Sequence, residues 1–270
     1  MGTAITEMNI TNKHKKPFSQ IVREVVAISD IILEILDARF ITETRVPELE
    51  EEIKAAGKKI IYIINKADLA DVDRLKSSET LRKLKPYVLV SSKERRGKAQ
   101  LMKMIKIEIK RLNVPFPKKH VGIIGYPNTG KSSLINYLSG KGGAKTSAEA
   151  NYTKGMQKIK LASDILLLDT PGIVPPKEDN LLQRSIVKKA ELGIESYSQT
   201  KDPELAVSAL LQNHQEEIDM YYKLNSEGDY EKLSEILGRR WHFLQKGNKV
   251  DIDKTLRRVL KDWQEGKIRS

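Results

Sequence analysis

The segment that most constrains this chain is Gly125-Tyr126-Pro127-Asn128-Thr129-Gly130-Lys131-Ser132, which fits the pattern G-x-x-x-x-G-K-[ST]. It follows an apolar run over 120–125 that predicts a buried strand, and a helical pattern begins at Lys131. In this setting the glycines let backbone N–H groups surround phosphates at the helix N-terminus. Lys131 would reach the β- and γ-phosphates, and Ser132 would ligate Mg²⁺. Thr129, Gly130 and Ser133 are expected to line the same site, so the segment predicts binding of a nucleoside triphosphate.

The first two thirds of the chain alternate between apolar strand patterns and helical patterns. Strands are predicted over 31–36, 59–64, 87–91, 120–125, 157–162 and 164–169, and helices over 47–57, 71–84, 98–111 and from 131. This alternation predicts a mostly parallel α/β sheet with right-handed crossovers. From 180 to 265 the pattern is helical, with breaks near 200–203, 225–229 and 247–250. We therefore predict an α/β domain over 1–178 and a small all-helical domain over 179–270.

The segment Asn65-Lys66-Ala67-Asp68 predicts which base is bound, because it follows a buried strand. A carboxylate at Asp68 can accept hydrogen bonds from N1–H and the exocyclic amine of guanine, and adenine offers no such pair of donors. Ser91-Ser92-Lys93 follows the next predicted strand and would complete the base pocket. Ligand sites of open α/β sheets lie beyond the carboxyl ends of the strands, so both segments are expected at one edge.

Two further segments are expected to bind Mg²⁺ and to respond to the γ-phosphate. In Asp169-Thr170-Pro171-Gly172, after the strand pattern ILLLD, Asp169 would hold the Mg²⁺ shell through water and Gly172 N–H would detect the γ-phosphate. Thr153, within Asn151-Tyr152-Thr153-Lys154-Gly155, is the candidate switch threonine that closes on Mg²⁺ when a γ-phosphate is present. The chain then enters the helical region within about ten residues, so a shift at Gly172 would reorient residues 180–270.

The order of these motifs along the chain is unusual. A Ras-like GTPase runs from the phosphate-binding loop through the switch threonine and D-x-x-G to N-K-x-D and the serine-rich base loop. Here N-K-A-D and S-S-K come first, followed by the phosphate-binding loop, Thr153 and D-T-P-G. The same sheet can form if the original ends are joined through 98–119 and the chain opens just after D-T-P-G. The sequence therefore predicts a circularly permuted Ras-like P-loop GTPase domain.

With this permuted order, the chain resembles the circularly permuted ribosome-assembly GTPases of the YlqF/nucleostemin type. Asp37-Ala38-Arg39 is similar to the D-A-R signature of that family, and Thr44-Arg45-Val46-Pro47 stands in place of its usual S-R-N-P. Thr153-Lys154-Gly155 matches the switch segment, and 205–267 is similar to the helical C-terminal domain. The resemblance covers nearly the whole chain. It implies hydrolysis of GTP to GDP as a maturation checkpoint, with the large ribosomal subunit or its precursor as partner.

The resemblance also bears on how the attacking water would be positioned. Ile173 occupies the place of the Ras-like glutamine and cannot hydrogen-bond water, so slow intrinsic hydrolysis is expected. In bacterial members of the family a histidine is proposed sixteen residues before an aspartate, and His14 stands sixteen residues before Asp30. Its flanks, Lys13 and Lys15, differ from the usual Gly and Met, so a solvent-exposed histidine in a basic tail stays the alternative. Asn128 resembles the asparagine that binds K⁺ in potassium-activated GTPases, where K⁺ supplies positive charge beside the phosphates.

The distribution of charge favours an RNA partner. The net charge is +12, with 32 basic against 21 acidic residues over 1–179, 6 against 11 over 180–238, and 10 against 4 over 239–270. The segments 93–119 and 239–270 are expected to contact rRNA phosphates. The candidates in the second segment are Arg239, Arg240, Lys246, Lys249, Arg257 and Arg258. Trp241, His242 and Phe243 could stack on bases, although such residues at helical spacing usually belong to a core.

Two alternatives to a ribosome-activated GTPase follow from the same residues. One is a GTP-dependent RNA-binding scaffold with negligible turnover, which Ile173 favours. The other is a GTPase that acts on tRNA or a membrane, and the chain shows no amphipathic anchor with large aromatics. The chain contains no cysteine, which excludes disulfides and thiolate metal sites, and its longest apolar runs are too short to span a bilayer. A cytoplasmic monomer without membrane contact is expected.

Overall fold

The computed structural model describes residues 18–112, 118–140, 157–169 and 184–268. Its main sheet has six strands in the order β3-β2-β1-β4-β6-β5. They are β1 (Ile31–Asp37), β2 (Lys59–Asn65), β3 (Tyr87–Leu89), β4 (Lys119–Gly125), β5 (Gln157–Lys160) and β6 (Ile165–Asp169). Every neighbouring pair is parallel except β5–β6, which is antiparallel. The predicted parallel sheet and the strand pair after the phosphate-binding loop are therefore confirmed.

Helices cover both faces of this sheet, which explains why its central strands are apolar on both sides. One face packs against α1 (Phe18–Ile28), α2 (Pro47–Ala55), α3 (Val72–Ser77) and α4 (Glu79–Lys83). The other face packs against α5 (Lys98–Leu112) and α6 (Lys131–Ser139). All seven residues of β1 are buried. Each fully buried Ile or Leu contributes roughly 1.5–3 kcal/mol to folding, so β1 is the centre of the fold.

The helical prediction over 71–84 is wrong in one respect, because this stretch forms two short helices. Asp71 caps α3 by accepting hydrogen bonds from the backbone N–H groups of Asp73 and Arg74. Ser78 ends α3 and caps α4, with its hydroxyl accepting from Leu81 N at 3.2 Å. A second N-cap inside the helical pattern therefore ends one helix and begins another. Helix α1 is not among the elements predicted from the sequence.

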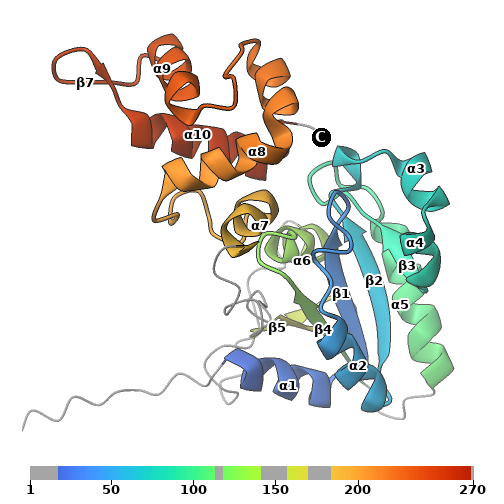
Figure 1. Ribbon diagram of the computed structural model, residues 1–270. Coiled ribbons are helices and arrows are strands. Elements are labelled where there is room, and N and C mark those ends of the chain that lie inside the picture. Colours follow the sequence, from blue (N-terminus) through green and yellow to red (C-terminus); the bar gives the residue numbers. More distant parts are fainter. Residues whose placement is uncertain (1–17, 113–117, 141–156, 170–183, 269–270) are drawn as a thin grey trace, which may run out of the picture.

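The C-terminal part contains four helices and a small hairpin among its described residues. The helices are α7 (Arg184–Leu192), α8 (Pro203–Tyr222), α9 (Tyr230–Arg240) and α10 (Ile252–Gln264). They share an apolar core that includes Val207, Leu233 and Trp263. Figure 1 shows them gathered as a separate group at one end of the sheet. The predicted boundary near 178 lies outside the described residues.

The prediction that this part is all-helical is wrong in detail, because β7 (Leu244–Gln245) and β8 (Lys249–Val250) form an antiparallel hairpin. Gly247 and Asn248 at its turn have positive φ angles of 84° and 61°, which glycine and asparagine tolerate better than other residues. The break expected at 247–250 is therefore a hairpin turn and not a loop between helices. Figure 1 shows this hairpin extending away from the helices.

Candidate functional site

The fold places the predicted motifs at the carboxyl edge of neighbouring strands. N-K-A-D begins at the last residue of β2, S-S-K follows β3, the G-x-x-x-x-G-K-S segment begins at the last residue of β4, and Asp169 ends β6. Parallel strands carry their carboxyl ends to the same edge, which is where open α/β sheets bind ligands. Segments in permuted order along the chain thus meet at one edge of the sheet.

Asn65 joins the base-recognition segments to the phosphate-binding loop. Its Nδ2 donates to Thr129 O at 2.8 Å, and its Oδ1 accepts from Ser92 Oγ at 2.9 Å and from Ser92 N at 3.3 Å. The side chain is buried, so these bonds fix three loops against one another. Gly130 has a φ of 92°, and a Cβ there would collide with Asn65 Nδ2, which explains the glycine at this position.

Asp68 and the S-S-K segment form the base-recognition corner. Ser91 Oγ donates to Asp68 Oδ1 at 2.5 Å and accepts from Glu94 N at 3.0 Å. The serine therefore orients the Asp68 carboxylate, which keeps acceptor capacity for a base. Lys93 is exposed in the turn that follows. The predicted pairing of these two segments is present in the structure, and their role in base selection stays a prediction.

Lys131 lies inside the phosphate-binding loop. Its Nζ donates to Gly125 O at 2.8 Å and to Tyr126 O at 2.6 Å. Burial lowers the pKa of the Lys131 ammonium to about 8, and the charge of Asp169 acts in the opposite direction. An ammonium held in a desolvated loop gains from any anion that enters beside it. Ser132 and Ser133 follow in the first turn of α6 and are exposed.

Lys66 contacts Asp37, a residue for which the sequence predicted no function. Its backbone is left-handed, with φ 59° and ψ 33°, and its Nζ lies 2.8 Å from Asp37 Oδ2. Burial lowers the pKa of Lys66, while Asp37 acts to raise it. Arg39 Nε and Nη2 donate to the same carboxylate at 3.1 and 2.8 Å. The position of Asp37 at a strand end, like that of Asn65, is the sequence signal that could have identified it.

Asn128, the predicted K⁺ ligand, contacts the C-terminal part. Its Nδ2 donates to Gly193 O just after α7, and its φ is 56°. Its remaining amide oxygen is the atom that could coordinate a cation. His14, Thr153, Gly172 and Ile173 lie outside the described residues, so their arrangement stays a prediction. Among the described residues, no cluster of three or more His, Asp or Glu side chains could hold a metal ion by itself.

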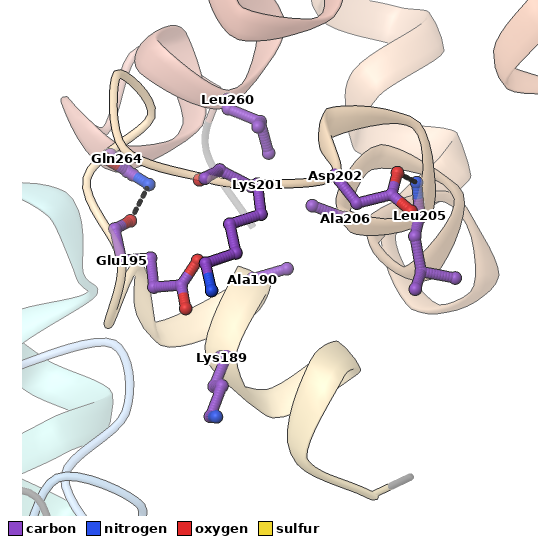
Figure 2. Close-up of a pocket in the computed structure, with 10 residues that line it drawn as sticks. Lys189, Ala190, Glu195, Lys201, Asp202, Leu205, Ala206, Leu260 and Gln264 are labelled. Atoms are coloured by element: carbon purple, nitrogen blue, oxygen red, sulfur yellow. Dashed lines mark hydrogen bonds between the residues drawn. The ribbon is translucent and has the colours of Figure 1, made fainter. Parts of the chain in front are cut away.

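A separate pocket of about 190 Å³ lies within the C-terminal part (Figure 2). It is lined by residues of α7, α8, α10 and the loop after α7, including Lys189, Lys201, Ala206 and Leu260. None of the motifs from the sequence contributes to it. No helix of the described segments is both long and apolar enough to cross a membrane.

The sheet and the motifs at its carboxyl edge together define the class of protein: a P-loop nucleotide-binding fold with its motifs in permuted order along the chain. Residues 120–227 match the family model described as 50S ribosome-binding GTPase. Over 255 residues the chain is 37% identical to an uncharacterized GTP-binding protein of Methanocaldococcus jannaschii, with 94% of this chain and 66% of that protein covered. It is 32% identical over 251 residues to nucleolar GTP-binding protein 2 of Neurospora crassa, covering 91% of this chain and 40% of the relative.

Two solved structures have the same fold. They are the GDP-bound and GNP-bound forms of YlqF from T. maritima, with TM-scores of 0.60 and 0.59 and identities of 22% and 24%. They cover 91% and 92% of this chain, and the match spans 94% of each solved chain. The chain belongs to the circularly permuted GTPases of the YlqF/nucleostemin type. It spans about two thirds of the archaeal relative and 40% of the fungal one.

Proposed function

We propose that this protein binds GTP, hydrolyses it to GDP and phosphate, and acts as a switch in assembly of the large ribosomal subunit. The observation that carries the proposal is the position of Asn65, whose amide bridges Thr129 of the phosphate-binding loop and Ser92 of the base loop. One nucleotide can therefore contact both segments. The family description, a 50S ribosome-binding GTPase, supports the ribosomal role.

Mg²⁺ fits the oxygen donors at this edge. Ser132 offers a hydroxyl in the first turn of α6. Asp169 offers a carboxylate at the end of β6, the strand that pairs with β4. Hard oxygen ligands of this kind suit Mg²⁺, which usually keeps several waters beside the phosphates. Thr153 would join them when a γ-phosphate is present. Mg²⁺ would neutralise charge on the phosphate oxygens, while Lys131 and Gly172 N–H would hold those oxygens in place.

Hydrolysis is proposed to be slow until the protein meets its partner. Ile173 cannot orient water, so another group must do so, and His14 is the candidate. The segment around His14 is basic, so RNA could bind it and activate turnover. K⁺ at Asn128 would add positive charge near the phosphates. If turnover is equal in Na⁺ and K⁺ buffers, the K⁺ proposal is wrong.

The four candidate arginines already bond to other residues of this protein, which reduces the set of candidate RNA contacts. Arg240 donates to Tyr222 O, Arg257 to Tyr197 O, and Arg258 pairs with Asp262. Arg239 pairs with Glu235. Lys246 and Lys249, by contrast, are exposed on the hairpin and have no ion-pair partner among the described residues. We therefore favour these two lysines as phosphate contacts.

The aromatic residues beside the hairpin form a partly exposed cluster, in which the rings meet at tilted and edge-to-face angles. The ring centroids of Trp241 and Phe243 are 5.7 Å apart, and those of Tyr222 and Trp241 are 5.5 Å apart. Lys254 Nζ lies 4.3 Å from the Phe243 centroid. The rings thus belong to the edge of the C-terminal core, and His242 is the exposed member. Base stacking at this position stays a proposal, and so do a cytoplasmic location and a monomeric state.

The other basic segment, 93–119, contains a group of exposed lysines on one side of α5. Lys103, Lys106 and Lys110 recur at helical spacing and border a shallow hollow that Met102 and Ile107 also line. The only acidic residue of α5, Glu108, is buried and pairs with Arg111 at 2.7 Å. This basic side of α5 is a second candidate contact with rRNA phosphates.

The alternative function, a GTP-dependent RNA-binding scaffold with negligible turnover, is favoured by Ile173. Turnover of GTP in K⁺ buffer, alone and with purified large or small subunits, distinguishes the two, with ATP as the control nucleotide. We expect stimulation by the large subunit only, and loss of turnover in Lys131→Ala. Tight GTP binding without stimulation by either subunit would favour the scaffold. His14→Ala is the next test, and it should reduce stimulated turnover while GTP affinity is retained.

A further inference from the structure

The C-terminal part contacts three separate loops at the edge of the sheet where the predicted nucleotide-binding motifs meet, which we call the nucleotide edge. Asn128 of the phosphate-binding loop donates to Gly193 O, and Arg39 Nη1 donates to Trp263 O at 3.4 Å. Leu69, which follows Asp68, packs so closely on Gly266 that a Cβ on the glycine would collide with it. The phosphate side and the base side of the edge are therefore both in contact with the C-terminal part.

On the base side, two buried ion pairs connect Lys66 through Asp37 to Arg39, the residue that contacts Trp263. Asp37 accepts from Lys66 on one side and from Arg39 on the other, each with an N–O distance of 2.8 Å. The Asp37 and Arg39 side chains are 4% and 6% exposed. Because both are desolvated, neither can lose its partner without a large penalty. The orientation of Lys66 thus depends on Asp37, and that of Asp37 depends on Arg39.

The C-terminal residues that form these contacts are bonded to one another. Trp263 Nε1 donates to Glu191 O at 2.9 Å, and Gln264 Nε2 donates to Glu195 O at 2.9 Å (Figure 2). Gln264 also accepts from Tyr197 N at 3.1 Å. The segments 191–197 and 263–266 therefore form one unit, which we call the docking unit. It connects the Arg39 contact to the Asn128 contact.

We propose that the docking unit forms a wall of the guanine nucleotide site, and that its docking on Arg39, Leu69 and Asn128 sets the affinity for guanine nucleotide. The inference rests on the proposed function and extends it. In this proposal Asp37 and Arg39 are positioning residues, because they would act through Lys66, with which Asp37 pairs. Binding and docking are reciprocal: if docking strengthens nucleotide binding, the nucleotide strengthens docking by the same factor.

This coupling differs from the one expected through D-T-P-G, which depends on the γ-phosphate. The contacts at Lys66 and Leu69 lie on the base side of the site, so GDP should engage the docking unit as well as GTP. Binding of GDP alone is therefore the right probe. It also avoids turnover and needs no ribosomal subunit.

The test uses the full chain and two readouts. The first is the equilibrium affinity for fluorescently labelled GDP in Arg39→Ala and Gly266→Ala. Arg74→Ala is the matched control, because Arg74 is exposed on α3 and its loss removes the same charge as the Arg39 variant. The second readout is the emission of Trp263 in a Trp241→Phe background, since the chain contains only these two tryptophans. Thermal unfolding of each variant shows that it is folded.

We expect Arg39→Ala and Gly266→Ala each to weaken GDP binding about five- to tenfold, within the usual range of coupling between sites. Arg74→Ala should bind like the parent protein. GDP should shift the emission of Trp263, and Arg39→Ala should abolish that shift. A purely structural role for Arg39 would change the unfolding temperature without removing the response to GDP.

If both variants are folded and bind GDP as tightly as the parent, the proposed coupling is wrong while the proposed function stands. If the parent protein itself binds no guanine nucleotide, the proposed function and the coupling both fail. A shift of Trp263 emission that persists in Arg39→Ala would also contradict the path through Asp37 and Arg39.

Discussion

The ammonium of Lys131 is buried, and burial disfavours its charged form. Its pKa of about 8 arises from burial in the phosphate-binding loop, and a bound phosphate should raise it again. Between about pH 8 and pH 10 the protein should therefore take up a proton when GDP binds, and affinity should fall as the pH rises through this window. Calorimetry at pH 8.5 in two buffers of different ionisation enthalpy measures the proton. At pH 6.5 the buffer dependence from this lysine should vanish, and equal buffer dependence at both pH values would contradict the prediction.

The carboxylate of Asp68 should decide which base is accepted. In Asp68→Asn the Oδ1 atom can still accept from Ser91 Oγ, and the new amide donates where the carboxylate accepted. Affinity for GDP should fall about 100-fold or more, because guanine's donors lose an acceptor. Xanthosine diphosphate, which carries a carbonyl in place of the amine, should then bind better than GDP. Competition against labelled nucleotide measures both affinities, and an equal loss for the two nucleotides would argue against base recognition by Asp68.

At the scale of elements, β1 contains a buried carboxyl group that costs stability. Glu34 Oε1 accepts from Val46 N at 3.1 Å, while Oε2 has no hydrogen-bond partner among the described residues. Burial, with a smaller contribution from Glu50, raises the pKa of Glu34 from 4.5 to about 8. Glu50 itself is different: burial acts to raise its pKa, but Arg45 and Tyr62 outweigh burial and hold it below the usual value.

The raised pKa of Glu34 predicts how the stability of the folded protein changes with pH. Between pH 4.5 and pH 8 folded Glu34 keeps a proton that the unfolded chain has lost, so the free energy of unfolding should fall as pH rises. The slope from this group is at most about 1.4 kcal/mol per pH unit. Glu34→Gln keeps the acceptor for Val46 and removes the titration. Urea unfolding at pH 6 and pH 8 should show a smaller loss in Glu34→Gln than in the parent, and equal losses would refute this.

At the scale of the whole molecule, two basic surfaces lie on different parts of the chain. One is the side of α5 with Lys103, Lys106 and Lys110, and the other is the hairpin with Lys246 and Lys249. A plot of log affinity for rRNA against log salt concentration has a negative slope whose size reflects the number of phosphate contacts. If both surfaces contact rRNA, neutralising the two hairpin lysines should make this slope shallower by about 1.5 to 2. Neutralising the three α5 lysines should make it shallower still.

Large-subunit rRNA titrated at several salt concentrations measures these slopes. The double variant Lys76→Ala/Lys83→Ala is the control for the hairpin variant, because it removes the same charge from exposed sites on α3 and α4. An equal change in slope for the control and the hairpin variant would show that only net charge matters. If neither the hairpin variant nor the α5 variant changes the slope, the RNA contact lies elsewhere on the protein.

The sequence by itself determined the class of fold and the segments that meet at the nucleotide edge. Strand and helix patterns are local. The G-x-x-x-x-G-K-S and N-K-A-D segments each hold the groups predicted to bind phosphate or base within a few consecutive residues. The same local reasoning failed at Ser78, where a second cap divides the helix, and at Gly247, where a break is a hairpin turn. In both places a short-range feature competes with a longer apolar pattern.

Only the tertiary structure decided how distant residues pair. Arg39 and Trp263 are 224 positions apart, and Asn128 and Gly193 are 65 apart. Nothing in the neighbourhood of either residue specifies its partner, because the pairing depends on how the C-terminal helices pack against the sheet edge. The shared carboxylate of Asp37 has the same origin: the register of β1 against β2 brings its strand end beside Lys66. Local sequence thus defines the binding segments, while packing of the two parts defines what holds them in place.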